Sequence, residues 1–354
     1  MKEYVSFFRP ELDGMQGYVP GEQPKISGLI KLNTNENPYP PAPGVVQALK
    51  KFDPARLRLY PDPLATNLRA ELAAMHGISY ENVIVGNGSD DILNIAIRCF
   101  CDEKRAMAMV YPSYSLYKTL CELQGCECIS IPLNEEDFSL PDNFLEQAER
   151  ANLLILTRPN APTGNSFPKE KVSEICEKFH GIVLIDEAYA DFASDNCAEF
   201  ATRYSNVIVA RTFSKSRNLA GLRLGYAFAC KEIIDGMMKM KDSYNVSMLS
   251  QTLAVASIWD HAYFRDCVAR IKVCRETLYH RLCGLGFKVI DSETNFLFAS
   301  PPDGDAETYF RKLRENKFLV RYFPGGMTGK YVRISIGTDE DMKAFYEFTK
   351  SLYR

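Results

Sequence analysis

The residues best suited to chemistry lie in the stretch 211–223, which follows an apolar run typical of a buried strand. Lys215 stands there in a hydroxyl-rich turn with Thr212 and Ser214, and Arg223 follows eight positions later. A lysine amine titrates at about 10.4, but partial burial and nearby cations lower its pKa and make it a nucleophile towards a carbonyl. The hydroxyls and the guanidinium suit a phosphate. The stretch predicts an imine-forming lysine beside a phosphate grip, with a solvated lysine as the alternative.

Ser214-Lys215, followed by Ala-Gly-Leu-Arg-Leu-Gly at 220–225, resembles the lysine motif of the fold-type I, pyridoxal phosphate-dependent aminotransferases. More narrowly, the chain is similar to the histidinol-phosphate aminotransferases, and the likeness runs from Tyr18 to Arg333. The resemblance implies an α/β fold whose large domain has a mostly parallel sheet of the seven-stranded type flanked by helices, with a smaller α+β domain. It also implies pyridoxal 5′-phosphate as the cofactor.

The order of apolar runs agrees with this fold. Strand-like runs at 82–85, 105–110, 129–131, 152–157, 181–186 and 206–210 alternate with helical segments, which predicts a mostly parallel sheet. A Pro-, Gly- and Asn-rich segment, 1–45, is too punctuated for regular structure and predicts an extended arm. We expect a large cofactor-binding domain over 46–245 and a small C-terminal domain over 246–354. One long helix is expected from about 247 to 283, and strands at 287–290, 295–299, 319–323 and 331–335.

Asp186 ends an uninterrupted apolar strand, so its carboxylate is expected to be buried and paired. A protonated pyridine nitrogen is a natural partner, and the pair keeps the ring an electron sink. Tyr189, three residues on, is expected to reach the phenolic oxygen of the cofactor. An acid that only caps a loop is the alternative. Lys215, Asp186 and Tyr189 are the predicted catalytic residues.

The remaining cofactor contacts are implied by the resemblance. A strand, a glycine turn and a helix at 82–101 form an arrangement that presents free N–H groups to a phosphate, and there the family grips the cofactor phosphate with Ser89 and Asp90. Tyr114 occupies the ring-stacking position. Tyr60 is predicted to reach the phosphate of the other subunit in a homodimer. In this chain Ala161 stands where the family motif Asn-Pro-Thr-Gly has its Asn. In the family that Asn donates to the phenolic oxygen of the cofactor, and Asn160 is predicted to supply this bond instead.

Two arginines lie among apolar strand residues near the C-terminus. By resemblance, Arg321 and Arg333 bind the anionic substrate, with Tyr18 facing the substrate phosphate; solvent-facing arginines are the alternative. We expect transamination of L-histidinol phosphate with 2-oxoglutarate in histidine biosynthesis. The rivals are a threonine-phosphate decarboxylase, an aromatic amino acid aminotransferase, and a non-catalytic pyridoxal phosphate-binding regulatory module.

Composition excludes several other classes. The chain has 354 residues, 46% of them hydrophobic and 25% charged, close to the soluble globular average. A formal net charge of −3 does not suggest a nucleic-acid partner. Eleven cysteines without paired Cys-x-x-Cys spacing indicate free thiols in a reducing cytoplasm. We expect no metal, because the four histidines form no ligand-spaced cluster, and no membrane span.

Overall fold

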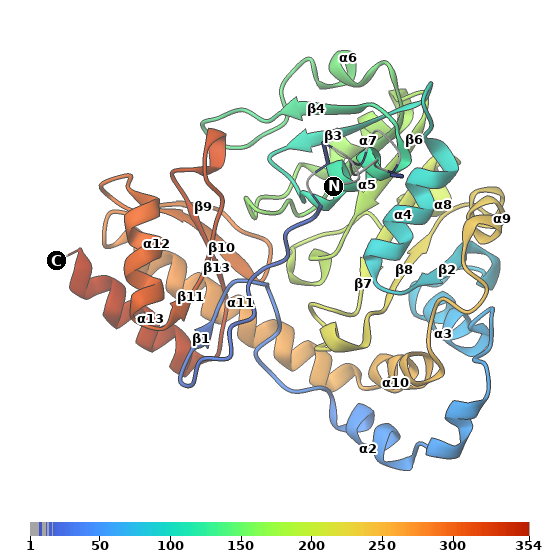
Figure 1. Cartoon of the computed structure of the whole chain (residues 1–354), viewed down its shortest axis with the longest axis horizontal. Helices are drawn as coiled ribbons and strands as arrows, with labels where there is room; N and C mark the ends of the chain where they lie inside the picture. Colours follow the sequence, from blue (N-terminus) through green and yellow to red (C-terminus); the bar gives the residue numbers. More distant parts are fainter. Residues whose placement is uncertain (1–6, 9–11, 13, 16, 354) are drawn as a thin grey trace, which may run out of the picture.

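The computed structural model describes residues 7, 8, 12, 14, 15 and 17–353. A seven-stranded sheet with the order β2-β8-β7-β6-β5-β3-β4 forms its larger part (Figure 1). Only β8 runs antiparallel to its neighbours in this sheet, so the prediction of a mostly parallel sheet is confirmed. Its strands are β2 (Val83–Gly86), β3 (Ala106–Tyr111), β4 (Cys128–Pro132), β5 (Ala151–Thr157), β6 (Ile182–Asp186), β7 (Val207–Thr212) and β8 (Gly225–Phe228).

Two layers of helices cover this sheet. Its central strands are buried along their length, and alternate residues point to opposite faces. One face packs on α4 (Ser89–Phe100), α5 (Leu116–Gln124) and α9 (Lys231–Met240). The other packs on α3 (Thr66–His76), α7 (Lys169–Lys178), α8 (Phe200–Arg203) and α10 (Met248–Trp259). The other described helical segments before α10 are α2 (Pro43–Lys51), α6 (Phe144–Ala148), η1 (Pro54–Arg58), η2 (Tyr80–Asn82), η3 (Ala190–Phe192) and η4 (Ala220–Leu222).

A second, four-stranded antiparallel sheet has the order β12-β13-β10-β9. It packs with three helices around its own apolar core, and in Figure 1 this part lies to the left of the large sheet. Its elements are β9 (Lys288–Ile290), β10 (Phe296–Ser300), β12 (Arg321–Tyr322), β13 (Val332–Ser335), η5 (Gly326–Thr328), α11 (His261–Cys283), α12 (Ala306–Glu315) and α13 (Asp339–Leu352).

The arm joins the two parts. Its short strand β1 (Ile30–Lys31) pairs in parallel with β11 (Phe318–Leu319), and in Figure 1 the arm runs between the two sheets. The chain leaves β11 for β12 at Val320, so the strand expected over 319–323 is divided between two sheets. The stretch before residue 17 lies largely outside the described residues.

The helix expected from 247 to 283 is two helices, because α10 ends and α11 begins at Asp260. The side-chain Oδ2 of Asp260 accepts a hydrogen bond from the backbone N–H of Gly44 at 3.2 Å. Such a short polar side chain competes with the helical backbone for hydrogen bonds, which favours a break. Leu253, Ala254 and Ile258 of α10 pack into the core of the large sheet. No helix in the described part of the chain is long and apolar enough to span a membrane.

Candidate active site

A cleft of about 660 Å³ lies at the carboxyl ends of β5, β6 and β7, where α/β sheets usually bind ligands. Thr157, Asp186 and Thr212 end these three strands and all line the cleft. The arm and the second sheet close its other side. The sequence-predicted residues that line it are Tyr18, Ser89, Asp90, Tyr114, Asp186, Tyr189, Thr212, Ser214, Lys215, Arg223, Arg321 and Arg333.

Lys215 lies in the turn after β7, and its Nζ donates a hydrogen bond to the carbonyl of Thr34 at 3.0 Å. Its own carbonyl accepts from Asn37 Nδ2 at 3.0 Å, so the arm holds this turn at two points. Burial lowers the pKa of the Lys215 amine to about 8, and the cations Arg333 and Arg223 act in the same direction. A substantial fraction of the amine is therefore neutral near pH 8, as a nucleophile requires.

Asp186 ends β6 with its carboxylate buried. Tyr117 Oη donates to Asp186 Oδ2 at 2.7 Å, and the backbone N–H of Ala188 donates to Oδ1 at 3.0 Å. Burial raises the pKa of Asp186 to about 6 in spite of these two donors. A cation placed beside this carboxylate would therefore be strongly favoured.

Tyr117 was not among the predicted site residues. It is fully buried in α5, and its hydroxyl lies 2.8 Å from Thr157 Oγ1 as well as bonding Asp186. Thr157 is also 2.9 Å from Ser113 Oγ. The sequence does carry a signal, since Tyr117 follows Tyr114 by three residues, but a tyrosine on the buried face of an amphipathic helix is normally assigned to packing.

Tyr189 follows Asp186 in the loop after β6 and is held by the arm. Asn35 Nδ2 donates to Tyr189 Oη at 2.9 Å, which leaves the phenolic hydrogen free to point into the cleft. Asn35 is itself fixed, because its Oδ1 accepts from Ser335 Oγ at 2.8 Å and its carbonyl accepts from Asn295 Nδ2 at 3.0 Å. Asn35 has a φ of 55°, which Asn tolerates better than most residues. Through these hydrogen bonds, Asn35 connects the arm to the loop that carries Tyr189 and to the small sheet.

An anion cradle forms where α4 begins. The first N–H groups of α4 are available at Ser89 and Asp90, and Thr212, Ser214 and Arg223 lie on the same wall of the cleft. Arg223 Nη2 bonds Asp90 Oδ2 at 2.9 Å. The Asp90 carboxylate would repel a phosphate, so only its backbone N–H suits an anion.

Glycine is needed beside this cradle. Gly88 has a φ of +87°, and a Cβ there would lie 2.6 Å from Arg223 Nη2. A Cβ on Gly225 would lie 2.3 Å from the backbone nitrogen of Ser89. The close approach of β8 to the start of α4 therefore requires Gly225, and Arg223 reaches the cradle only past Gly88. This donor set, with two hydroxyls, a guanidinium and free N–H groups, fits a phosphate monoester.

Tyr114 forms an aromatic wall of the cleft. Its ring meets Tyr117 edge-on at 5.5 Å and Tyr18 at 5.8 Å between centroids, with interplanar angles of 85° and 77°. Its hydroxyl points to Asp90 Oδ1 at 3.4 Å, and burial raises its pKa. A ring held at its edges keeps its face available for a flat ligand.

Arg321 and Arg333 are cross-strand partners in β12 and β13, so their side chains leave the same face of the small sheet. Arg333 Nη2 donates to the carbonyl of Asn33 at 2.9 Å, while its buried Nε has no protein partner in the described part of the chain. Arg321 Nη2 donates to Val19 O at 3.2 Å at the exposed rim. A half-buried, partly unpaired guanidinium facing a cleft is a strong anion site.

Two predicted residues lie outside this cleft. Asn160 is fully buried, and its Nδ2 donates to Pro112 O at 3.0 Å and Thr163 Oγ1 at 2.7 Å. Both amide hydrogens are therefore used within the loop, and only Ala161 and Pro162 of this motif line the cleft. The structure does not support a cofactor bond from Asn160. Tyr60 is 79% exposed and stacks on Tyr244 at 4.5 Å, away from the cleft of its own chain.

A buried ion pair lies behind the site. Arg211 Nη2 bonds Glu187 Oε2 at 2.6 Å, and its Nη1 lies 3.3 Å from Asp191 Oδ1. Ser216 donates to the other oxygen of Asp191. These contacts connect the loop after β6, which carries Asp186, to the turn that carries Lys215. Sequence reasoning missed this pair, because its members lie far apart along the chain.

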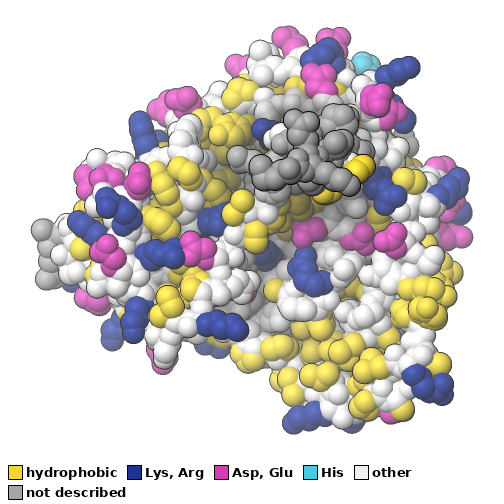
Figure 2. All heavy atoms as spheres, viewed as in Figure 1, with side chains coloured by type: hydrophobic (Ala, Val, Ile, Leu, Met, Phe, Trp, Pro, Cys, Tyr) yellow, Lys and Arg dark blue, Asp and Glu magenta, His cyan; other side chains and the backbone are white. Residues whose placement is uncertain are grey.

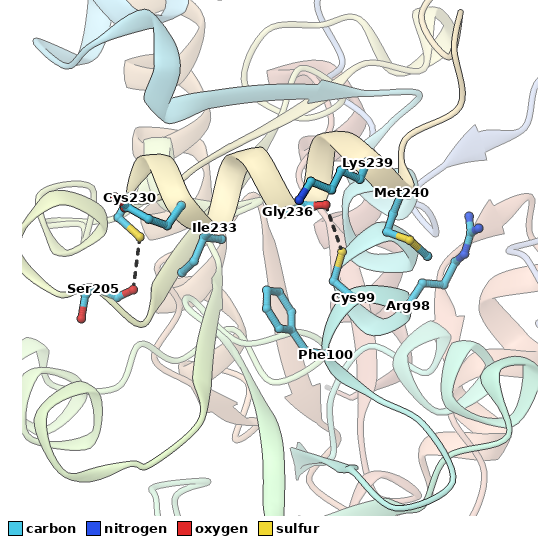
Figure 3. Close-up of a pocket in the computed structure, with 10 residues that line it drawn as sticks. Arg98, Cys99, Phe100, Ser205, Cys230, Ile233, Gly236, Lys239 and Met240 are labelled. Carbon is cyan, nitrogen blue, oxygen red and sulfur yellow. Dashed lines mark hydrogen bonds between the residues drawn. The ribbon is translucent and has the colours of Figure 1, made fainter.

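A second hollow, of about 570 Å³, lies on the outer side of α4 and α9 (Figure 3). Its walls are mainly apolar, and its two thiols are engaged: Cys230 Sγ donates to Ser205 O and Cys99 Sγ to Gly236 O. Arg98 and Lys239 belong to its lining and lie apart in the view. This hollow lacks the converging polar groups of the cleft at the strand ends.

Comparison with known proteins shows the family to which the chain belongs. The family model described as aminotransferase class I and II matches residues 27–348, and the chain belongs to this family. The histidinol-phosphate aminotransferase of Microcystis aeruginosa is 45% identical over 92% of both chains, and that of Chromohalobacter salexigens is 40% identical over 98% of this chain. At this identity the chain groups with the histidinol-phosphate aminotransferases.

Solved structures agree on the fold. The histidinol-phosphate aminotransferase of Sinorhizobium meliloti, solved in complex with pyridoxal-5′-phosphate, superposes with a TM-score of 0.89 at 24% identity and covers 99% of both chains. A putative aminotransferase from Burkholderia pseudomallei superposes with a TM-score of 0.82 at 27% identity, over 93% of this chain. The predicted fold class is confirmed.

Proposed function

We propose that this chain is a pyridoxal phosphate-dependent aminotransferase that acts on L-histidinol phosphate in histidine biosynthesis, with 2-oxoglutarate as the acceptor. The observation that carries the proposal is one cleft with three features: a half-buried lysine of lowered pKa, a buried carboxylate with no cationic side chain bonded to it in the described part of the chain, and two anion sites. The anion cradle at α4 fits the cofactor phosphate, and the Arg321–Arg333 pair fits an anionic substrate. The names of the relatives support the choice of amine.

Pyridoxal phosphate, when bound, supplies an aldehyde for the substrate amine and a ring that takes up electrons from the adjacent carbon. Lys215 would hold the aldehyde through its amine, and the same amine would serve as the base for the proton on the substrate carbon. Asp186, fixed by Tyr117, would keep the ring nitrogen protonated. Tyr189, fixed by Asn35, would donate to the phenolic oxygen. Ser89, Asp90, Thr212, Ser214 and Arg223 would hold the phosphate, and Tyr114 would stack on the ring.

Substrate exchange requires one site to accept a phosphate and a dicarboxylate in turn. A guanidinium suits both, because its planar fork of donors matches phosphate and carboxylate alike. Arg333, half-buried and partly unpaired, would hold whichever anion is present. Arg321 and Tyr18, which lie at the exposed rim, would add contacts to the substrate phosphate.

Purified enzyme would test this function by single-turnover spectroscopy of the two half-reactions. Histidinol phosphate should bleach the absorbance of the lysine-bound cofactor faster than phenylalanine or threonine phosphate does, and 2-oxoglutarate should restore it. Arg333→Lys should slow both halves, whereas Arg321→Ala and Tyr18→Phe should slow chiefly the phosphate-bearing half. Arg311 is an exposed arginine of α12, so Arg311→Ala is the matched control and should slow neither half-reaction. A preference for phenylalanine would move the enzyme to the aromatic class.

We also propose a homodimer in which Tyr60 completes the cofactor site of the partner. Supporting this, apolar side chains gather at the lower right of Figure 2, where Figure 1 places α2, α3 and α10. The exposed apolar residues in and near these elements include Leu49, Leu57, Leu59, Tyr60, Leu64 and Trp259. Contiguous apolar surface of this kind is typical of an interface.

The domain division is likewise proposed. An arm over 1–45, a large domain and a small domain agree with the two sheets, but α10 packs with the large sheet. We therefore place the last boundary at Asp260 instead of 245. A cytoplasmic location is supported by the eleven cysteines, all of which are free thiols.

A further inference from the structure

Four cysteines from different segments gather at one end of α5. Cys121 lies in its last turn, Cys126 follows the glycine that ends it, Cys128 begins β4, and Cys101 follows α4. The Sγ atoms of Cys121 and Cys126 are 3.3 Å apart. No group of residues in the described part of the chain is arranged to hold a metal ion, so ligation does not explain the cluster.

The two nearest thiols differ in exposure. Cys121 is 1% exposed, and its Sγ lies 3.6 Å from Met107 Sδ. Cys126 is only partly buried. Cys126 Sγ donates to Cys121 Sγ and, at 3.6 Å, to the carbonyl of Cys121. Contacts with the Cys101 and Cys121 thiols lower the pKa of Cys126, and contact with Cys126 raises the pKa of Cys121. An accessible thiolate next to a second thiol is the arrangement found in cysteines that oxidise reversibly.

We propose that Cys126 and Cys121 are a site of reversible oxidation, in which peroxide converts the two thiols into a disulfide. The Cys126 thiolate attacks one peroxide oxygen and forms a sulfenic acid, with release of hydroxide. Cys121 then attacks the Cys126 sulfur, the S–O bond breaks, and water leaves. In sum, two thiols and one hydrogen peroxide become one disulfide and two waters. A dithiol reductant reverses the change.

The disulfide would act on the active site through α5. Tyr117 and Cys121 are one turn apart on the same buried face of this helix. The sulfurs must move from 3.3 Å to about 2.05 Å to bond. Tyr117 donates to Asp186, so a shift of α5 would weaken that hydrogen bond. This second step rests on the proposed function, whereas the disulfide itself does not.

Stepwise hydrogen peroxide treatment of the cofactor-loaded enzyme, followed by thiol blocking and peptide mass spectrometry, tests the site. We expect a peptide linked through Cys121 and Cys126 and two hydrogens lighter, formed before exposed Cys283 is modified and lost after dithiothreitol. Cys126→Ser and Cys121→Ser should each abolish it, and Cys283→Ser should not. Earlier oxidation of Cys283, or a link through Cys101 or Cys128 instead, would overturn the assignment.

Activity tests the connection to Asp186. Weakening one hydrogen bond predicts a fall in kcat of about 2- to 10-fold on oxidation. Dithiothreitol should restore kcat, and Cys126→Ser should be insensitive to the same peroxide dose. If the disulfide forms while kcat stays constant, the path through Tyr117 is refuted. If the enzyme does not transaminate at all, the proposed function fails, and the mass measurement still decides the disulfide.

Discussion

Tyr117→Phe removes a single hydroxyl from a fully buried position and leaves the ring in place. That hydroxyl donates to Asp186 Oδ2 at 2.7 Å, and the hydrogen bond opposes the effect of burial on the pKa of Asp186. We expect the variant to have an even higher Asp186 pKa, and its stability to depend on pH in a way that identifies the lost partner as a carboxylate.

The sign follows from linkage in the cofactor-free protein. Burial raises the pKa of Asp186 from 3.8 to about 6, so the folded state binds the proton more tightly than the unfolded state. That stability is fully present below pH 3.8 and is lost as pH rises through about 6, a loss of roughly 3 kcal/mol. At pH 8, Tyr117→Phe should lower the free energy of unfolding by about 1.5–3 kcal/mol relative to the wild type, because a charged group loses its donor. At pH 5, where folded Asp186 is mostly protonated, the same substitution should lower the free energy of unfolding by only about 0.5–1.5 kcal/mol.

Urea unfolding of cofactor-free protein at pH 5 and pH 8 measures this difference as a shift of the midpoint. Tyr309→Phe is a matched control, because Tyr309 is also fully buried but its hydroxyl pairs with Thr349 Oγ1 at 2.7 Å, which carries no charge. The control should destabilise the protein equally at both pH values. Equal destabilisation by Tyr117→Phe at both pH values would refute the assigned role.

Four further results are expected. Lys215→Ala should lower turnover by about 100- to 10,000-fold, because it removes the proposed base, and activity near the wild-type rate would exclude that role. The wild-type rate of cofactor attachment should rise with pH through about 8, the lowered pKa of the Lys215 amine, when followed by stopped-flow absorbance. Asp186→Ala should lower kcat by more than about tenfold, or ~1.4 kcal/mol, and a smaller loss would make Asp186 structural. Tyr60→Phe should weaken cofactor binding about 10- to 150-fold without changing the dimer mass in light scattering, and an active monomer would contradict the shared site.

The local sequence determined the large sheet and the positions of its main polar groups. Apolar runs ending in Asp186 and in the turn of Lys215 had to become buried strands, since only a sheet covered on both faces satisfies them. Parallel strands bring their carboxyl ends to one edge, so the order of residues along the chain was enough to predict that these two side chains would line one cleft.

Tertiary structure alone decided which groups fix these side chains. Tyr117 and Asn35 contact Asp186 and Tyr189 across 69 and 154 residues, and no periodicity in the sequence reports such a contact. The contacts of Asn160 were likewise decided by tertiary structure, although its type and position suggested a ligand contact. The fold of its loop directs the amide to Pro112 and Thr163, because a buried amide hydrogen takes whichever acceptor packing brings near.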